Sequence, residues 1–182
     1  MMRRVLLAAG LLCAAGPLAA QNIYPADTAL DADHAAQRDV FVVLRDSTSS
    51  ISAASARLMT EMGPTASLPW LQARARGVAQ ACARSVAPLA QAKSVVSEAD
   101  WLKPYQMKPR AELLKAMDAF NPQLAACTKQ WTAMAADTSQ TRLRNNAPHA
   151  MSVLESQVTD FNRAAQLYLQ YISVKLPLPK VK

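Results

Sequence analysis

The sequence predicts an all-α protein, namely an antiparallel up-down-up-down four-helix bundle with one disulfide between two of its helices. Apolar residues recur alternately four and three positions apart over four long stretches, which is the spacing of a helix that packs along one stripe. Proline, glycine or short polar segments separate these stretches, and the chain of 182 residues contains only four glycines. Two cysteines lie in the apolar stripes of neighbouring stretches, which indicates a disulfide between helices.

The first twenty residues have the pattern of a cleaved bacterial-type export signal. Arg3 and Arg4 precede an apolar run at residues 5–15, and small residues lead to Ala20. This run is shorter than the roughly twenty residues that cross a membrane, so we expect no transmembrane span after cleavage; an uncleaved anchor is the alternative. The pattern predicts a periplasmic or secreted protein that begins at Gln21.

Residues 21–32 are predicted to form an extended lead-in, followed by the bundle at residues 33–175. Pro25 and the lack of an apolar stripe argue against helix in the lead-in. Asp31 or Asp33 is expected to cap the first helix, because a short carboxylate accepts hydrogen bonds from the unpaired N–H groups of a helix start.

The first helix is predicted to end at Gly63-Pro64, a pair that favours a helix C-terminus. Its apolar stripe consists of Val40, Leu44, Ser47, Ile51, Ala54, Leu58 and Met62.

Residues 71–134 are predicted to form a helical hairpin at the centre of the bundle, with its turn at Lys103 and Pro104. The stripe of its first helix consists of Leu71, Ala75, Val78, Cys82, Ser85, Leu89, Ala92 and Val96. The stripe of its second helix consists of Leu113, Met117, Phe120, Leu124, Cys127, Trp131 and Met134.

A disulfide between Cys82 and Cys127 is predicted from their positions in this hairpin. Cys82 lies 22 residues before Pro104 and Cys127 lies 23 residues after it, so two antiparallel helices bring them to the same height. Removal of Cys13 with the export signal leaves an even number of cysteines in an oxidising compartment, which favours a bridge. Two buried free thiols are the alternative.

The last helix is predicted to begin near Asn146 and Pro148 and to end before Pro177. Its stripe consists of Leu154, Val158, Phe161, Ala165, Tyr168 and Ile172. Residues 176–182 form a Pro-rich basic tail, for which we favour fraying over a role in capping the bundle or reaching a partner.

Short connections make neighbouring helices antiparallel, which predicts the up-down-up-down order. The alternative is an open pair of hairpins that completes its core as a homodimer, because Tyr168 and Tyr171 widen the apolar face of the last helix.

Catalytic and cofactor-binding patterns are absent from the sequence. After the export signal, His34 and His149 are the two histidines, and there is no CxxCH, HExxH, GxSxG or Gly-rich phosphate loop. The inward-facing Glu and ExxH pairs of di-iron bundles are also missing. The sequence therefore predicts a protein that is not an enzyme and has no bound cofactor.

One set of residues is a candidate metal site, because the predicted topology gathers it at one pole of the bundle. Thioether sulfur and imidazole are ligands that suit Cu(I). Core packing is the favoured alternative for these residues, since methionine commonly fills gaps in cores. The set consists of Met59, Met62, Met134, His149 and Met151.

The chain is basic, with a formal net charge of +7 that falls to +5 when Arg3 and Arg4 leave with the export signal. The basic residues are dispersed among Ala and Gln, which indicates a solvated face and argues against nucleic acid as a partner. We predict an exported, non-enzymatic helical-bundle protein of the cell envelope that binds a protein or an envelope polymer. The alternative is a small periplasmic carrier of copper or a cofactor.

Overall fold

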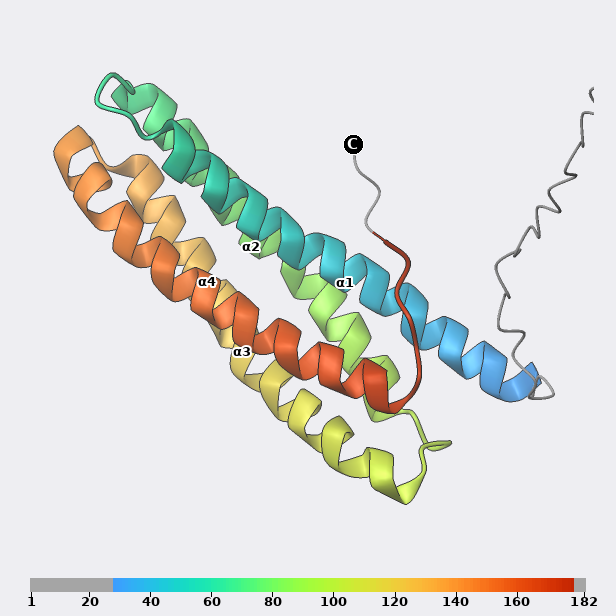
Figure 1. Ribbon diagram of the computed structural model, residues 1–182. Helices are drawn as coiled ribbons and strands as arrows, with labels where there is room; N and C mark the ends of the chain where they lie inside the picture. Colours follow the sequence, from blue (N-terminus) through green and yellow to red (C-terminus); the bar gives the residue numbers. More distant parts are fainter. Residues whose placement is uncertain (1–27, 179–182) are drawn as a thin grey trace, which may run out of the picture.

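The structure, a computed structural model, describes residues 28–178, which form four α-helices and no strand (Figure 1). Consecutive helices run antiparallel, so the fold predicted from the sequence is confirmed. The predicted export signal at residues 1–20 lies outside the described residues. The helices are α1 (Thr28–Glu61), α2 (Leu68–Ser97), α3 (Pro104–Ala136) and α4 (Gln140–Tyr171).

Helix α1 begins at Thr28, five residues before the predicted boundary at residue 33. Asp31 and Asp33 therefore lie inside the helix, and the prediction that one of them is its cap is wrong. No proline lies between Pro25 and Pro64, so nothing in the backbone of residues 28–32 prevents helix. The helix therefore extends further towards the N-terminus than the apolar stripe alone indicates.

Helix α4 begins at Gln140 and passes through Pro148, so the predicted start near Asn146 is wrong. Ser139 caps the helix, and its side chain accepts a hydrogen bond from the backbone N–H of Arg142 at 3.3 Å. The side chain of Arg142 also pairs with Asp137 at 2.8 Å. Residues 140–146 thus form the first turns of the helix, although most of them are polar. Polar residues are tolerated there because only one face of the helix is buried.

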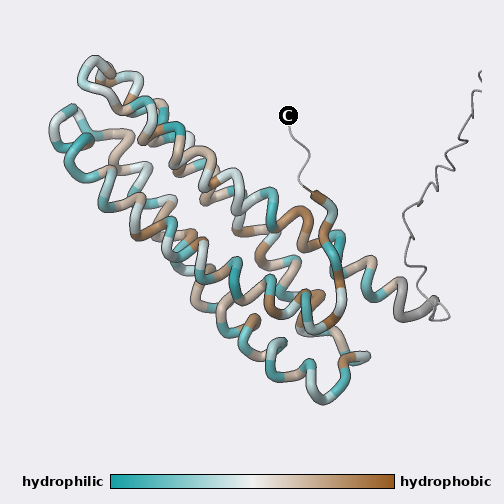
Figure 2. Tube along the Cα trace, in the orientation of Figure 1, coloured by the Kyte–Doolittle hydropathy of each residue, from teal (hydrophilic) through white to brown (hydrophobic). Residues whose placement is uncertain are grey.

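The apolar stripes face one another inside the bundle, and hydrophobic positions recur along each helix between hydrophilic ones (Figure 2). Every predicted stripe position of α2 is buried, and so is every predicted position of α4. In α3 the prediction holds from Leu113 to Trp131, whereas Met134 is only partly buried and packs against the core beside Ala135. The heptad spacing therefore identified the core correctly in three helices.

Helix α1 buries a more polar stripe than predicted. Thr48 is buried in place of Ser47, and Gln37 and Ser55 are buried as well. The amide of Gln37 donates to the carbonyl of Val95 at 3.2 Å, and the hydroxyl of Thr48 donates to the carbonyl of Arg45 at 3.0 Å. These side chains are small or polar, so α1 brings less apolar bulk to the core than its neighbours do.

A disulfide joins Cys82 of α2 to Cys127 of α3, as predicted. The two Cα atoms are 6.2 Å apart, and the side chain of Cys82 is fully buried. This separation lies within the range that an unstrained bridge spans. The bridge places α2 and α3 side by side at the centre of the chain.

The packing between helices is uneven. Helices α1 and α2, and likewise α2 and α3, contact each other extensively, whereas α1 and α4 contact each other much less. No connecting loop ties the first helix to the last. The bundle is therefore least tightly closed along the α1–α4 side.

Candidate binding groove between the first and last helices

A groove of about 410 Å³ lies between α1 and α4. Its walls are mostly apolar, with polar side chains among them. A volume of this size falls in the range of ligand-binding clefts in proteins, which are about 300–1,000 Å³. The lining residues are Phe41, Leu44, Arg45, Phe161, Asn162, Ala165, Gln166, Leu169, Gln170, Val174 and Leu176.

The segment that follows α4 folds back across this groove (Figure 1). Ser173 has a left-handed backbone with φ of 60°, and the backbone N–H of Val174 donates to the carbonyl of Leu169 at 3.0 Å. The N–H of Ser173 donates to the carbonyl of Gln170 at 3.1 Å, which completes a Schellman motif. Val174 and Leu169, the pair that makes the hydrophobic contact in this motif, both line the groove.

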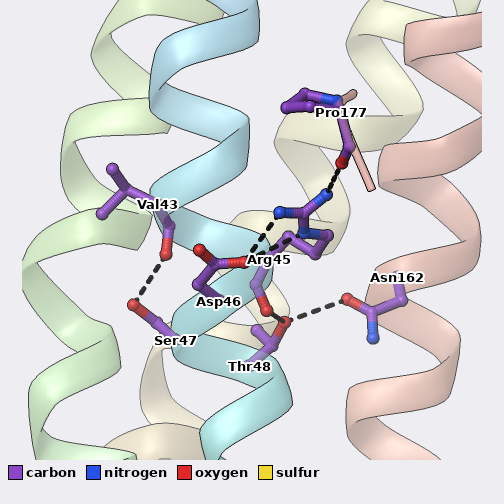
Figure 3. Close-up of polar contacts among 7 residues, drawn as sticks. All are labelled: Val43, Arg45, Asp46, Ser47, Thr48, Asn162 and Pro177. Atoms are coloured by element: carbon purple, nitrogen blue, oxygen red, sulfur yellow. Dashed lines mark hydrogen bonds and ion pairs between the residues drawn. The ribbon is translucent and has the colours of Figure 1, made fainter. Parts of the chain in front are cut away.

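The folded-back segment is held by both polar and apolar contacts. The guanidinium of Arg45 donates to the carbonyl of Pro177 and forms an ion pair with Asp46 at 2.8 Å (Figure 3). Leu176 is partly buried and packs against the core, whereas Leu178 is 90% exposed. The prediction that the tail frays is therefore wrong as far as Pro177, and residues 179–182 lie outside the described residues.

One polar contact joins α1 directly to α4 beside the groove. The hydroxyl of Thr48 lies 3.4 Å from the side-chain oxygen of Asn162 and shares its one hydrogen between this oxygen and the nearer carbonyl of Arg45 (Figure 3). Asn162, Gln166 and Gln170 lie on one side of α4 and carry both donors and acceptors. The groove therefore presents hydrogen-bonding groups beside its apolar walls, as a site for an extended peptide requires.

Tyr168 lies in the core beside Phe41, one of the residues that line the groove. The two ring centroids are 6.0 Å apart, and Tyr168 is fully buried. Its hydroxyl has no hydrogen-bond partner within the described part of the chain. Burial raises the pKa of Tyr168 to about 12, and the positive charge of Arg110 opposes this rise.

We expect stability to fall between pH 10 and 12, and to fall less in Tyr168→Phe. A tyrosine in the unfolded chain ionises near pH 10, whereas the folded state keeps this phenol protonated up to about pH 12. This contribution to stability is complete below pH 10 and is lost as the pH rises through 12, and the loss amounts to about 2 kcal/mol. Urea unfolding of both proteins at several pH values from 9 to 12 measures it.

Tyr171→Phe is the matched control for this experiment, because Tyr171 is 45% exposed. It should keep the alkaline destabilisation of the wild type. Identical pH dependence in wild type and Tyr168→Phe would contradict the assignment. At neutral pH, Tyr168→Phe should be neutral or slightly stabilising, since it removes a buried hydroxyl without a partner.

The predicted copper ligands lie on helix segments that meet at one pole, but their side chains differ in exposure. Met151 is buried in the core, and Met62 and Met134 are partly buried against it. Met59 and His149 are exposed. Since His149 and Met151 lie on different faces of α4, the structure does not direct both towards one ion, and copper binding stays a prediction.

Sequence reasoning missed the groove and the residues beside it. The only local signal is a polar residue directly after an apolar stripe position, as in Leu44-Arg45 and Phe161-Asn162. Any amphipathic helix has such pairs, so they did not distinguish this side of the bundle from the others. The sequence also does not predict the turn at Ser173, because a Schellman motif usually has glycine at that position.

None of the described helices has an apolar stretch long enough for a membrane span. Among the residues that the structure describes, no three His, Cys, Asp or Glu side chains gather as a metal site would require.

We compared the chain with protein-family models, curated proteins and solved structures, and none of them matches it.

Proposed function

We propose that this chain is an exported, non-enzymatic binding protein of the cell envelope, and that the α1–α4 groove binds an extended apolar segment of a partner protein. One observation carries the proposal: the chain's own tail packs along this groove, where Val174 and Leu176 form part of the wall and the carbonyl of Pro177 accepts from Arg45. A partner segment of similar chemistry would take the place of this tail. Export is supported by the pattern of the first twenty residues and by the disulfide, which is typical of oxidising compartments.

The tail shows what the groove selects. Leu176 supplies an apolar side chain that packs against the core, and Pro177 presents a carbonyl that accepts from Arg45. An extended segment with leucine and proline loses little conformational freedom on binding, because proline restricts the backbone beforehand. The apolar walls thus favour aliphatic side chains, and Arg45 offers a hydrogen-bond donor to a backbone carbonyl of the segment.

The tail is also a competitor for the groove. Because it is tethered to α4, it is present at a high effective concentration, and a partner binds only the fraction of molecules in which the tail has left. Weakening the hold of the tail should therefore raise the apparent affinity for a partner segment without any change in the groove itself.

The test uses a fluorescently labelled peptide with the sequence of residues 173–182 and the full-length mature protein. Leu176→Ser should bind the peptide about five- to tenfold more tightly than the wild type, since it removes the partly buried side chain of the competing tail. Leu178→Ser is the matched control and should behave as the wild type, because Leu178 is exposed. Fluorescence polarisation measures the dissociation constants.

A second pair of variants shows where the peptide binds. Gln166→Trp places a large ring at the groove, whereas Ser156→Trp places the same ring on another, exposed part of α4. In the Leu176→Ser background, the first should abolish peptide binding and the second should preserve it. Equal binding by all variants, or none by Leu176→Ser, would refute the proposal.

A further inference from the structure

A second groove lies between α1 and α2 and has a different character from the first. Its volume is about 280 Å³, and small residues such as Ala54, Gly77 and Ala81 line its centre. Three arginines also line it, and no carboxylate does. They are Arg57 of α1 and Arg74 and Arg84 of α2.

The positive charge of this groove is only partly neutralised within the chain. Arg74 forms an ion pair with Glu61 at 2.6 Å, and its guanidinium lies 5.0 Å from the centre of the Trp70 ring. Arg57 and Arg84 have no carboxylate within 4.0 Å among the residues that the structure describes. Two guanidinium groups thus remain available to an outside anion.

Gly77 supplies an independent observation, because nothing in the fold requires a glycine there. A Cβ atom at Gly77 would meet no other atom within 4 Å. Its backbone is helical, so the left-handed conformation that favours glycine is not involved. Glycine in a helix interior is destabilising relative to alanine. What Gly77 provides is open space in the middle of the groove.

The spacing of the arginines indicates the shape of the ligand. Arg74 and Arg84 are ten residues apart on α2, which corresponds to roughly 15 Å along the helix axis. Arg57 faces the same groove from the antiparallel α1. A linear chain of anionic groups matches a groove of this length better than a single phosphate does, and it can pair with Arg57 and Arg84. Guanidinium groups suit this task, since they bind the oxygen atoms of phosphate and carboxylate in a bidentate manner.

We infer that the α1–α2 groove binds a linear polyanion through Arg57 and Arg84, beside Arg74, which is already paired with Glu61. Its repeated phosphate or carboxylate groups lie along the groove and over Gly77. This site is separate from the α1–α4 groove, and the inference does not depend on the function proposed for that groove.

The test titrates the full-length mature protein with a short linear polyphosphate, with polygalacturonate as a polymer of carboxylates and with orthophosphate as a single anion. Calorimetry should detect binding of at least one polymer and much weaker binding of orthophosphate. Binding of polyphosphate alone would indicate a ligand with phosphate groups, and binding of polygalacturonate alone would indicate a ligand with carboxylate groups. Binding of neither polymer, or of orthophosphate as tightly as of the polymers, would overturn the inference.

Two double variants with the same loss of charge separate a specific site from general attraction. Arg57→Gln with Arg84→Gln removes the two available guanidinium groups and should weaken polymer binding about tenfold. Lys115→Gln with Lys129→Gln removes two exposed charges from α3 and should weaken it by less than about twofold. Equal weakening by both pairs would show that only net charge matters, and would overturn the inference.

Gly77 gives a test that loss of folding cannot mimic. Gly77→Ala should raise the melting temperature, because the added Cβ has room and alanine favours helix. Gly77→Leu should retain a cooperative melting transition while its side chain fills the groove and abolishes polymer binding. A folded Gly77→Leu protein that binds the polymer as the wild type does would contradict the inference.

Discussion

Replacing Cys82 and Cys127 by serine should lower the free energy of unfolding by about 4 kcal/mol. The bridge spans a sequence separation of 45 residues, and closing such a loop in the unfolded chain gives a stabilisation of this size by the loop-entropy relation. The loss grows if the serine hydroxyls remain buried without partners, as Cys82 is fully buried. Thermal melting should show a decrease of about 10 °C for a domain of this length.

Reductant provides the control for this prediction. Dithiothreitol should lower the melting temperature of the wild type and leave that of the double serine variant unchanged. A thiol titration in denaturant should find no free thiol in unreduced wild-type protein that lacks residues 1–20. Two titratable thiols in that protein would contradict the bridge.

Phe120→Ala should have a similar or larger effect, a loss of about 3–5 kcal/mol in the free energy of unfolding. Phe120 of α3 stacks on Phe161 of α4, with ring centroids 4.6 Å apart and an interplanar angle of 6°. Both side chains are buried, so removal of one ring leaves a cavity and unstacks the other. Urea unfolding of the two proteins measures the difference.

In Phe120→Ala, local stability should fall most in α4, because this helix contacts α3 far more than it contacts α1. Amide hydrogen exchange in Phe120→Ala should accelerate more in α4 than in α2, which lies between two neighbours and carries the disulfide. Tyr105→Ala is the matched control on the same helix, since Tyr105 is 59% exposed, and should change stability by no more than about 0.5 kcal/mol. Uniform acceleration across all helices would contradict this account of how α4 is held.

Helix boundaries show the limit of reasoning from apolar spacing. Pro148 predicts a helix start nearby, yet α4 begins at Gln140 and passes through Pro148. A cap at Ser139 and the pairing of Arg142 with Asp137 stabilise that earlier start. A polar segment can thus belong either to a loop or to the exposed face of a helix, and spacing alone does not distinguish them.

The sequence by itself determined the fold class, the buried faces of α2, α3 and α4 and the Cys82–Cys127 pairing, whereas in α1 Thr48 is buried in place of the predicted Ser47. Heptad spacing is a local property of the chain, so it identifies the inward face whichever helix becomes the neighbour. The disulfide followed because Cys82 and Cys127 lie at nearly equal distances from a short turn, and such a turn leaves two helices one way to pack.

Only the tertiary structure decided the two grooves. Helices α1 and α4 are not joined by a loop, so their separation depends on how the side chains between them pack. On that side lie Thr48, which contacts Asn162, and the small Ala165, which lines the groove. The tail turns towards the α1–α4 groove because Ser173 adopts a left-handed backbone conformation. This conformation is unusual for serine, so the sequence does not predict it. The α1–α2 groove likewise depends on how the faces of α1 and α2 align, which brings Arg57 to the same groove as Arg74 and Arg84. Spacing within one helix contains no information on alignment between helices, and for that reason the candidate sites became visible only in three dimensions.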